Sequence, residues 1–271
     1  MAFFSCVLTG ALLGVLYIFP HPAAEAAREG LQAWAFSLVP SLGPAMALCL
    51  YLCTHLPGRR SLQLLSAFLC GSPGGARLMQ ENVYDTKSAL HDAALTGVIS
   101  PLFFLSAVSQ WMQNEKAAVL LYFCHLCGAC LSALCIPGQP AQPAVSTPLT
   151  LPRCIQQAVN ALLQIGYYVM LGFVSARMIG CVFPHLPPFC SILLQSFAEV
   201  TGGTKQMIAS CFPLPLLCSV ISFGGLSILM QNHAYWKEKG VSLLHLAGIR
   251  LLHGFLSGIL CFFLQNLPFI G

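Results

Sequence analysis

Charge is what this sequence has least of. Asp, Glu, Lys and Arg make up 7% of the 271 residues and hydrophobic residues 57%, whereas about a quarter of an average soluble protein is charged. With a mean hydropathy of +0.77, this composition excludes an ordinary soluble domain and indicates a polytopic membrane protein. The net charge of +4 contains no basic run, so we predict no nucleic-acid partner.

Catalytic motifs are also missing. The chain has no GxSxG elbow, no HExxH pair and no phosphate loop, so we predict no enzyme, no catalytic residue and no cofactor. The fourteen cysteines fall mostly in apolar runs, where free thiols act as small hydrophobic residues. Cys124, Cys127 and Cys130 form a CxxCxxC run without a fourth ligand, so we predict no iron–sulfur cluster and no metal site.

The sequence does contain a pair of glycine breaks. The first occupies residues 71–77 (GSPGGAR), and its echo occupies residues 201–205 (TGGTK). Each break ends on a cation, and each is followed by a second echo, VIS at 98–100 and again at 220–222. The matching order favours an internal repeat of the kind found in transporters.

Hydrophobic runs predict about seven membrane spans. They lie at residues 1–20, 33–55, 93–112, 117–136, 156–183, 214–230 and 243–267, with polar loops at 21–32 and 231–240 and a Pro-rich linker at 137–152. Two further apolar stretches, 61–70 and 189–200, are shorter than the roughly 20 residues that a crossing needs. Because each runs into a glycine break, we predict two re-entrant hairpins; for the first, an interfacial amphipathic segment stays open.

The predicted fold is therefore an all-α polytopic membrane protein, with about seven transmembrane helices plus two re-entrant hairpins in two inverted repeats. Residues 33–112 form the first repeat (helix, hairpin, broken helix), and residues 156–232 form the second. Three crossings separate the hairpins, and an odd number inverts the second repeat. The loop Lys and Arg residues fall seven on one face and three on the other, which predicts a cytoplasmic N-terminus in a multi-pass membrane protein.

The breaks predict the site. A helix that starts after a break points free N–H groups and its positive dipole end into the membrane, which favours an anion. Arg77 and Lys205 would flank that anion, unless each reaches a lipid headgroup. Glu199 is expected to face a cavity, to pair with Lys205, Arg177 or Arg77, or to carry a coupling proton or cation. The predicted substrate-binding residues are Gly74, Gly75, Arg77, Ser100, Glu199, Thr201, Gly202, Gly203, Lys205, Ser222, Ser227 and Gln231.

Other polar residues have simpler expectations. His91 and Asp92 stand at a span boundary, where they are expected to be solvated. Arg250 shares one face of the last span with His245 and His253, and this stripe lines either a polar path or the headgroup region.

Three stretches carry a family resemblance. Residues 71–77, 196–203 (SFAEVTGG) and 222–231 (SFGGLSILMQ) resemble the YlbJ-like sporulation integral membrane proteins. These belong to the nucleoside-recognition (Gate) domain group, which is similar to the core of concentrative nucleoside transporters. The likeness runs from about Ala33 to the C-terminus. The chain is shorter than typical members and lacks polar residues that the family tends to have near Gly97, Gly202 and Leu229.

The resemblance implies a transporter core of two inverted repeats and a role in spore formation. It also implies dipicolinate, a small planar dicarboxylate, as the anionic solute. The expected function is a permease-like protein that works by alternating access. The alternative is a non-transporting membrane scaffold of the sporulation machinery. The oligomeric state stays open, a homo-oligomer included.

Overall fold

The structure is a computed structural model that describes residues 2–56, 60–80, 85–136 and 148–266. Within these ranges all regular structure is helical. The helices are α1 (Ala2–Ile18), α2 (Pro20–Ala33), η1 (Trp34–Leu38), α3 (Val39–His55), α4 (Arg60–Cys70), α5 (Gly74–Gln80), α6 (Thr86–Leu95), α7 (Pro101–Phe103), η2 (Phe104–Val108), α8 (Ser109–Met112), α9 (Glu115–Leu134), α10 (Leu151–Val182), α11 (Pro188–Ala198), α12 (Val200–Ala209), α13 (Leu214–Phe223), α14 (Gly225–Trp236), η3 (Lys237–Lys239) and α15 (Leu243–Leu264).

Five helical stretches, counted over the described residues and joining consecutive helices in two cases, are long and apolar enough to cross a membrane. They cover Pro20–His55, Glu115–Leu134, Leu151–Val182, Leu214–Lys239 and Leu243–Leu264. This agrees with the predicted α-helical membrane protein, although the count of seven spans stays a prediction. The expected first span forms the 17-residue α1, and the expected span 93–112 is interrupted between α6 and α7. Arg59, Leu267 and most of the expected linker lie outside the described residues.

The predicted polar loop at 21–32 is wrong, because these residues form α2. Gly30 packs directly on α10, where an added Cβ would lie 2.9 Å from the Cα of Met170. Arg177 of α10 binds Glu29 of α2 at 2.7 Å and Glu25 at 3.8 Å. Charged residues therefore mark the outer face of a helix here, rather than a turn.

The predicted loop at 231–240 is wrong in its first half, whereas its second half is the short η3 and the turn at Gly240. Its first half continues α14 to Trp236, whose side chain is buried. Gln231 and Asn232 are buried too, and their polar groups turn toward the interior. The polar residues at this end of the span therefore line the interior of the protein and do not mark the point where the chain leaves the membrane.

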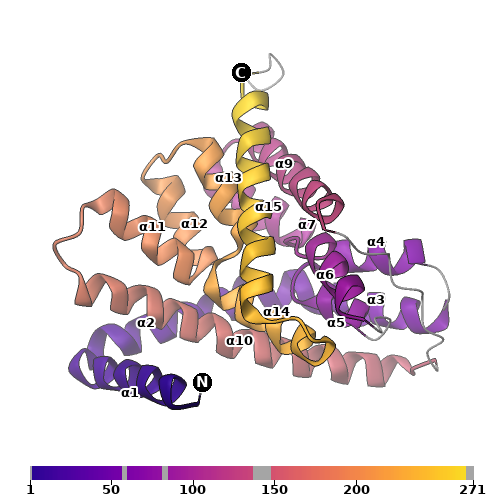
Figure 1. The fold of residues 1–271 in the computed structure, drawn as a ribbon, viewed down its shortest axis with the longest axis horizontal. Coiled ribbons are helices and arrows are strands. Elements are labelled where there is room, and N and C mark those ends of the chain that lie inside the picture. Colours follow the sequence, from indigo (N-terminus) through magenta and orange to yellow (C-terminus); the bar gives the residue numbers. More distant parts are fainter. Residues whose placement is uncertain (1, 57–59, 81–84, 137–147, 267–271) are drawn as a thin grey trace.

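Two groups of helices pack around the centre of the molecule. Figure 1 shows α15, in yellow, standing with α13 and α9, while α2 and α3 run with the long α10. Lipid is as apolar as Leu, so close packing rather than transfer from water holds such helices together. Gly254 and Gly258 of α15 allow this close packing, since an added Cβ would lie 2.7 Å and 3.1 Å, respectively, from backbone oxygens of α13.

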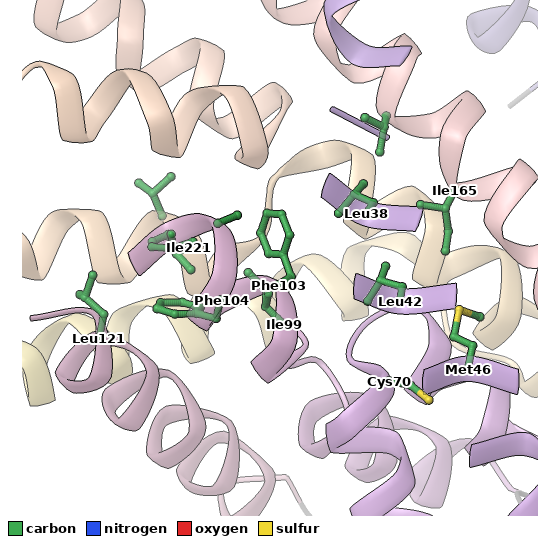
Figure 2. Packing of buried hydrophobic residues seen from close by; sticks show 14 of the residues in the cluster. Leu38, Leu42, Met46, Cys70, Ile99, Phe103, Phe104, Leu121, Ile165 and Ile221 are labelled. Atoms are coloured by element: carbon green, nitrogen blue, oxygen red, sulfur yellow. The ribbon is translucent and has the colours of Figure 1, made fainter. Parts of the chain in front are cut away.

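The main core joins both groups. Figure 2 shows Phe103 between Leu42 of α3 and Ile221 of α13, with Ile99 beneath it. Ile99 lies in the gap between α6 and α7, and Phe103 is the last residue of α7. The core is therefore built around a helix interruption, which leaves polar backbone at the centre of an apolar molecule.

Candidate functional site

Four helix interruptions meet inside the molecule. They separate α4 from α5, α6 from α7, α11 from α12 and α13 from α14. The first touches the second: Ser72 donates its N–H to the Val98 carbonyl at 2.6 Å, and Gly71, at φ +64°, lies against the Ser100 backbone. The third touches the fourth, since a Cβ on Gly225 would lie 3.1 Å from the Val200 nitrogen.

A cavity opens where the interruptions converge. Its empty volume is about 490 Å³, which includes open solvent, and about 40 Å³ of this can hold the centre of a water-sized sphere, so in this conformation the cavity has room for water rather than for a larger solute. Residues beside all four interruptions line it: Leu38, Leu42, Ser72, Pro73, Ile99, Ser100, Phe103, Ile165, Val169, Glu199, Val200, Thr201, Ser227, Ile228 and Gln231. The apolar walls and the few polar groups are typical of a ligand site.

Glu199 supplies the charge of this cavity. Its extended backbone (φ −142°, ψ 117°) ends α11 and starts α12. The side chain, 1% exposed, accepts the N–H of Thr201 at 2.9 Å and of Gly202 at 2.6 Å. A carboxylate in this N-cap position is stabilised by free N–H groups and by the positive end of the helix dipole.

No side-chain cation pairs with Glu199 among the described residues. Arg177 binds Glu29 and Glu25 instead, so pairing of Glu199 with Arg177 was a wrong expectation. Arg77 donates to the carbonyl and to the side-chain oxygen of Gln157, at 2.8 and 3.1 Å. Backbone N–H groups therefore compensate the buried carboxylate.

Neutral polar groups complete the lining. Ser100 donates to the Leu69 carbonyl at 3.1 Å. The hydroxyl of Ser227 and the amide nitrogen of Gln231 are buried and have no hydrogen-bond partner in the described part of the chain. Since buried polar groups are normally satisfied, these two atoms are free for a solute or for water.

Five of the twelve predicted site residues line the cavity. They are Ser100, Glu199, Thr201, Ser227 and Gln231. Three predicted glycines have a packing role instead. An added Cβ at Gly74 would lie 3.0 Å from the Cys70 Cβ, one at Gly75 would lie 2.8 Å from the Ala67 carbonyl oxygen, and one at Gly203 would lie 2.4 Å from the Ser196 Cα.

The other four predicted residues lie elsewhere. Arg77 ties α5 to α10, and Ser222 is bonded to His125 at 2.9 Å. Gly202 and the exposed Lys205 border a second, wider hollow with an empty volume of about 1130 Å³. Thr201 borders both hollows, so the two cations expected to clamp an anion stand outside the central cavity.

Sequence reasoning missed several partners of the site. Ser72 and Asn232 exchange hydrogen bonds of 2.9 and 2.6 Å between the first interruption and α14. An added Cβ at Gly172 of α10 would lie 2.8 Å from the Glu199 Cγ. Asn232 could have been found as an amide adjoining Gln231 in an apolar helix, whereas Gly172 carries no signal in one sequence.

Two readings of buried charges were also wrong. Asp92 is fully buried and binds Arg60 of α4. A carboxylate in an apolar interior requires such a partner. Arg250 and His253 are buried, at 2% and 0% exposed, and so do not pack against headgroups. His245 alone of that stripe stays at the surface, bonded to Ser242.

No family model matches this chain, and no curated protein or solved structure matches it. The likeness to the sporulation membrane proteins therefore stays a prediction from the three stretches that carry it.

Proposed function

We propose that this protein is a membrane transporter that moves a small polar solute, by alternating access, through the cavity at the four helix interruptions. One observation carries the proposal: residues in or close to all four interruptions line a single cavity, and its buried carboxylate has no side-chain cation partner among the described residues. Irregular backbone at membrane depth is tolerated where it lines a cavity, and transporters build their sites from interrupted helices.

The order of the helices supports the repeat part of the proposal. A long helix, a short helix pair and an interrupted helix occur at 20–112 and again at 151–236. In our proposal the short pairs are re-entrant hairpins and the second set is inverted. A cytoplasmic N-terminus follows from the distribution of Lys and Arg along the chain.

The chemistry of the lining bears on the solute. Glu199 offers acceptor oxygens and Gln231 an unpaired amide donor, which suits a solute with hydroxyl, amide or ammonium groups. An anionic solute such as dipicolinate would meet a carboxylate, and no cation lines the cavity among the described residues. That version of the proposal requires a coupling proton on Glu199 while the anion is bound.

Flux measurements test the proposal. Proteoliposomes with wild type, Glu199→Gln or Glu238→Gln would be offered labelled dipicolinate, uridine or succinate, with and without a pH gradient. We expect saturable uptake of one probe that falls at least tenfold in Glu199→Gln. Glu238, exposed on η3, is the matched control and should retain uptake.

The outcomes separate the candidate functions. Uptake that needs an inward proton gradient would favour proton-coupled anion transport at Glu199. Folded protein without flux of any probe would overturn the proposal. That result would instead favour the scaffold role in sporulation.

A further inference from the structure

We infer that Arg250 of α15 is a positioning residue for the cavity, because its single guanidinium group binds carbonyls at two of the four interruptions, the one between α6 and α7 and the one between α13 and α14. Its Nη1 donates to the Gly97 carbonyl just after α6, and its Nε donates to the Phe223 carbonyl at the end of α13, at 3.1 Å. That the cavity binds a solute rests on the proposed function, whereas the contacts of Arg250 do not depend on it.

Helix ends compensate the buried charge of Arg250. No carboxylate pairs with it in the part of the chain that the structure describes. The C-terminal end of a helix carries about half a negative charge. Arg250 binds the Phe223 carbonyl at the end of α13 and the Gly97 carbonyl two residues past the end of α6. The negative ends of two helices therefore lie near the guanidinium, while its Nη2 has no hydrogen-bond partner among the described residues.

One glycine in each interruption makes room for this guanidinium. At Gly224, where φ is +85°, an added Cβ would lie 2.6 Å from Nη2 of Arg250. At Gly97 an added Cβ would overlap Nη1. Both positions therefore need glycine for the same reason, because each lies against the Arg250 side chain of α15.

The arrangement bears directly on the cavity. Ile99 and Ser100 follow Gly97 by two and three residues, and Ser227 follows Phe223 by four, and all three line the cavity. By holding Gly97 and Phe223, Arg250 sets the spacing between cavity walls that belong to different halves of the chain.

His125 of α9 makes a second link between the same interruptions. Its Nε2 accepts the N–H of Ile99 at 2.8 Å, so its proton lies on Nδ1 and is donated to Ser222 of α13 at 2.9 Å. His253 of α15 in turn donates to the His125 carbonyl at 2.8 Å. The two spans outside the proposed repeats therefore cross-connect the interruptions of both.

Arginine is specifically suited to this role. Its planar fork directs Nε and Nη1 at two carbonyls at once, whereas a lysine ammonium is a point charge on a flexible stem. Arg250→Lys therefore keeps the charge and removes the simultaneous contact.

Hydrogen–deuterium exchange tests the inference without reference to transport. Wild type, Arg250→Lys and the control Arg177→Lys would be compared in detergent micelles. We expect amides at 96–104 and at 220–228 both to exchange at least tenfold faster in Arg250→Lys, with little change in α2 and α10. Arg177→Lys should accelerate neither segment, since Arg177 contacts Glu29 and Glu25 at the surface.

Gly97→Ala provides a second variant, since its methyl group displaces the guanidinium without removing it. It should reproduce the exchange pattern at both segments. Acceleration at only one segment, acceleration spread evenly over α15, or exchange equal to that of wild type would overturn the inference.

A transport measurement adds a readout that loss of packing alone would not give. For a probe found to be carried, Arg250→Lys should raise KM about tenfold and leave the maximal rate per folded molecule near that of wild type. Unchanged KM would contradict the positioning role. Absence of any carried probe would overturn the proposed function and leave the exchange result to decide about Arg250.

Discussion

The two short helix pairs, α4–α5 and α11–α12, answer the same structural need in different ways. Each must satisfy the free N–H groups of a helix that starts inside the molecule. The first uses neutral groups: the Gly71 carbonyl accepts the N–H of Gly75 at 2.7 Å, and beside it Ser72 binds the Val98 carbonyl and Asn232. The second uses the carboxylate of Glu199. The cavity between them is therefore charged from one side only.

The cations after the two breaks differ as well. Arg77 is partly buried and binds Gln157 of α10, whereas Lys205 is exposed beside the wider hollow. Equivalent places in a sequence echo thus have unlike surroundings. The two breaks agree in that each separates two short helices, and they differ in the chemistry at the start of the second helix.

The largest effect is expected from Glu199→Ala, which removes the charged side of the comparison. It leaves two buried N–H groups of α12 without an acceptor, and we expect a loss of roughly 2 kcal/mol in the free energy of unfolding. Denaturant unfolding of the purified protein in micelles measures this loss. Glu199→Gln keeps an acceptor oxygen and should stay within about 1 kcal/mol of wild type; equal losses in both variants would contradict the capping role.

Ser72→Ala breaks the neutral side. It removes the hydroxyl that bonds Asn232, while Asn232 keeps its bond to the Ile228 carbonyl at 2.9 Å. We expect a smaller loss of about 1 kcal/mol in the same unfolding measurement. Uptake of any carried probe should fall less than in Glu199→Gln, because the charge of the cavity is intact. If uptake falls as far as in Glu199→Gln, the two breaks are not chemically distinct.

The smallest effect is expected at Asp85, an N-cap residue at the protein surface. Asp85 starts α6 as Glu199 starts α12, but it is exposed. The Ser88 hydroxyl, together with the backbone N–H groups of Ser88 and Lys87, lowers the pKa of Asp85 below its usual 3.8. A lowered folded-state pKa means that the stabilisation is present above the unfolded pKa and is lost as pH falls through the folded value.

We therefore expect exchange at the amides of Lys87 and Ser88 to accelerate as pH falls below about 3.8, after correction for intrinsic rates. Asn is an equally good N-cap that does not titrate. Asp85→Asn should remove this acid step and leave exchange at neutral pH nearly unchanged. A step of the same size in both proteins would assign it to another group.

Much of the fold was predictable because its signals are local. Scarce charge and long apolar runs predicted membrane-type helices, and the glycine breaks predicted where short helices would end. The errors at 21–32 and 231–240 share one cause. Both segments are polar, but α2 packs on α10 through Gly30, and α14 turns Asn232 toward Ser72.

The site was predictable only in part, for the same reason. Glu199 stood out as an acid beside a break in an apolar run, and it lines the cavity. Arg77 stood out equally, but the direction of its side chain depends on α10, which is distant in sequence. Arg250 was assigned to a polar stripe, and its contacts with Gly97 and Phe223 could not be read from spacing along one helix.

Composition and local pattern by themselves determine that this chain is helical, that it suits a membrane, and that its helices are interrupted near residues 71–75, 97–101, 199–203 and 224–225. These properties depend on neighbours in sequence: apolar content, glycine and proline. Which interruptions meet, which charges face the cavity and which carbonyls hold Arg250 follow from tertiary packing alone. The physical reason is that each of these contacts joins segments far apart in the chain, where side-chain direction depends on the partner helix.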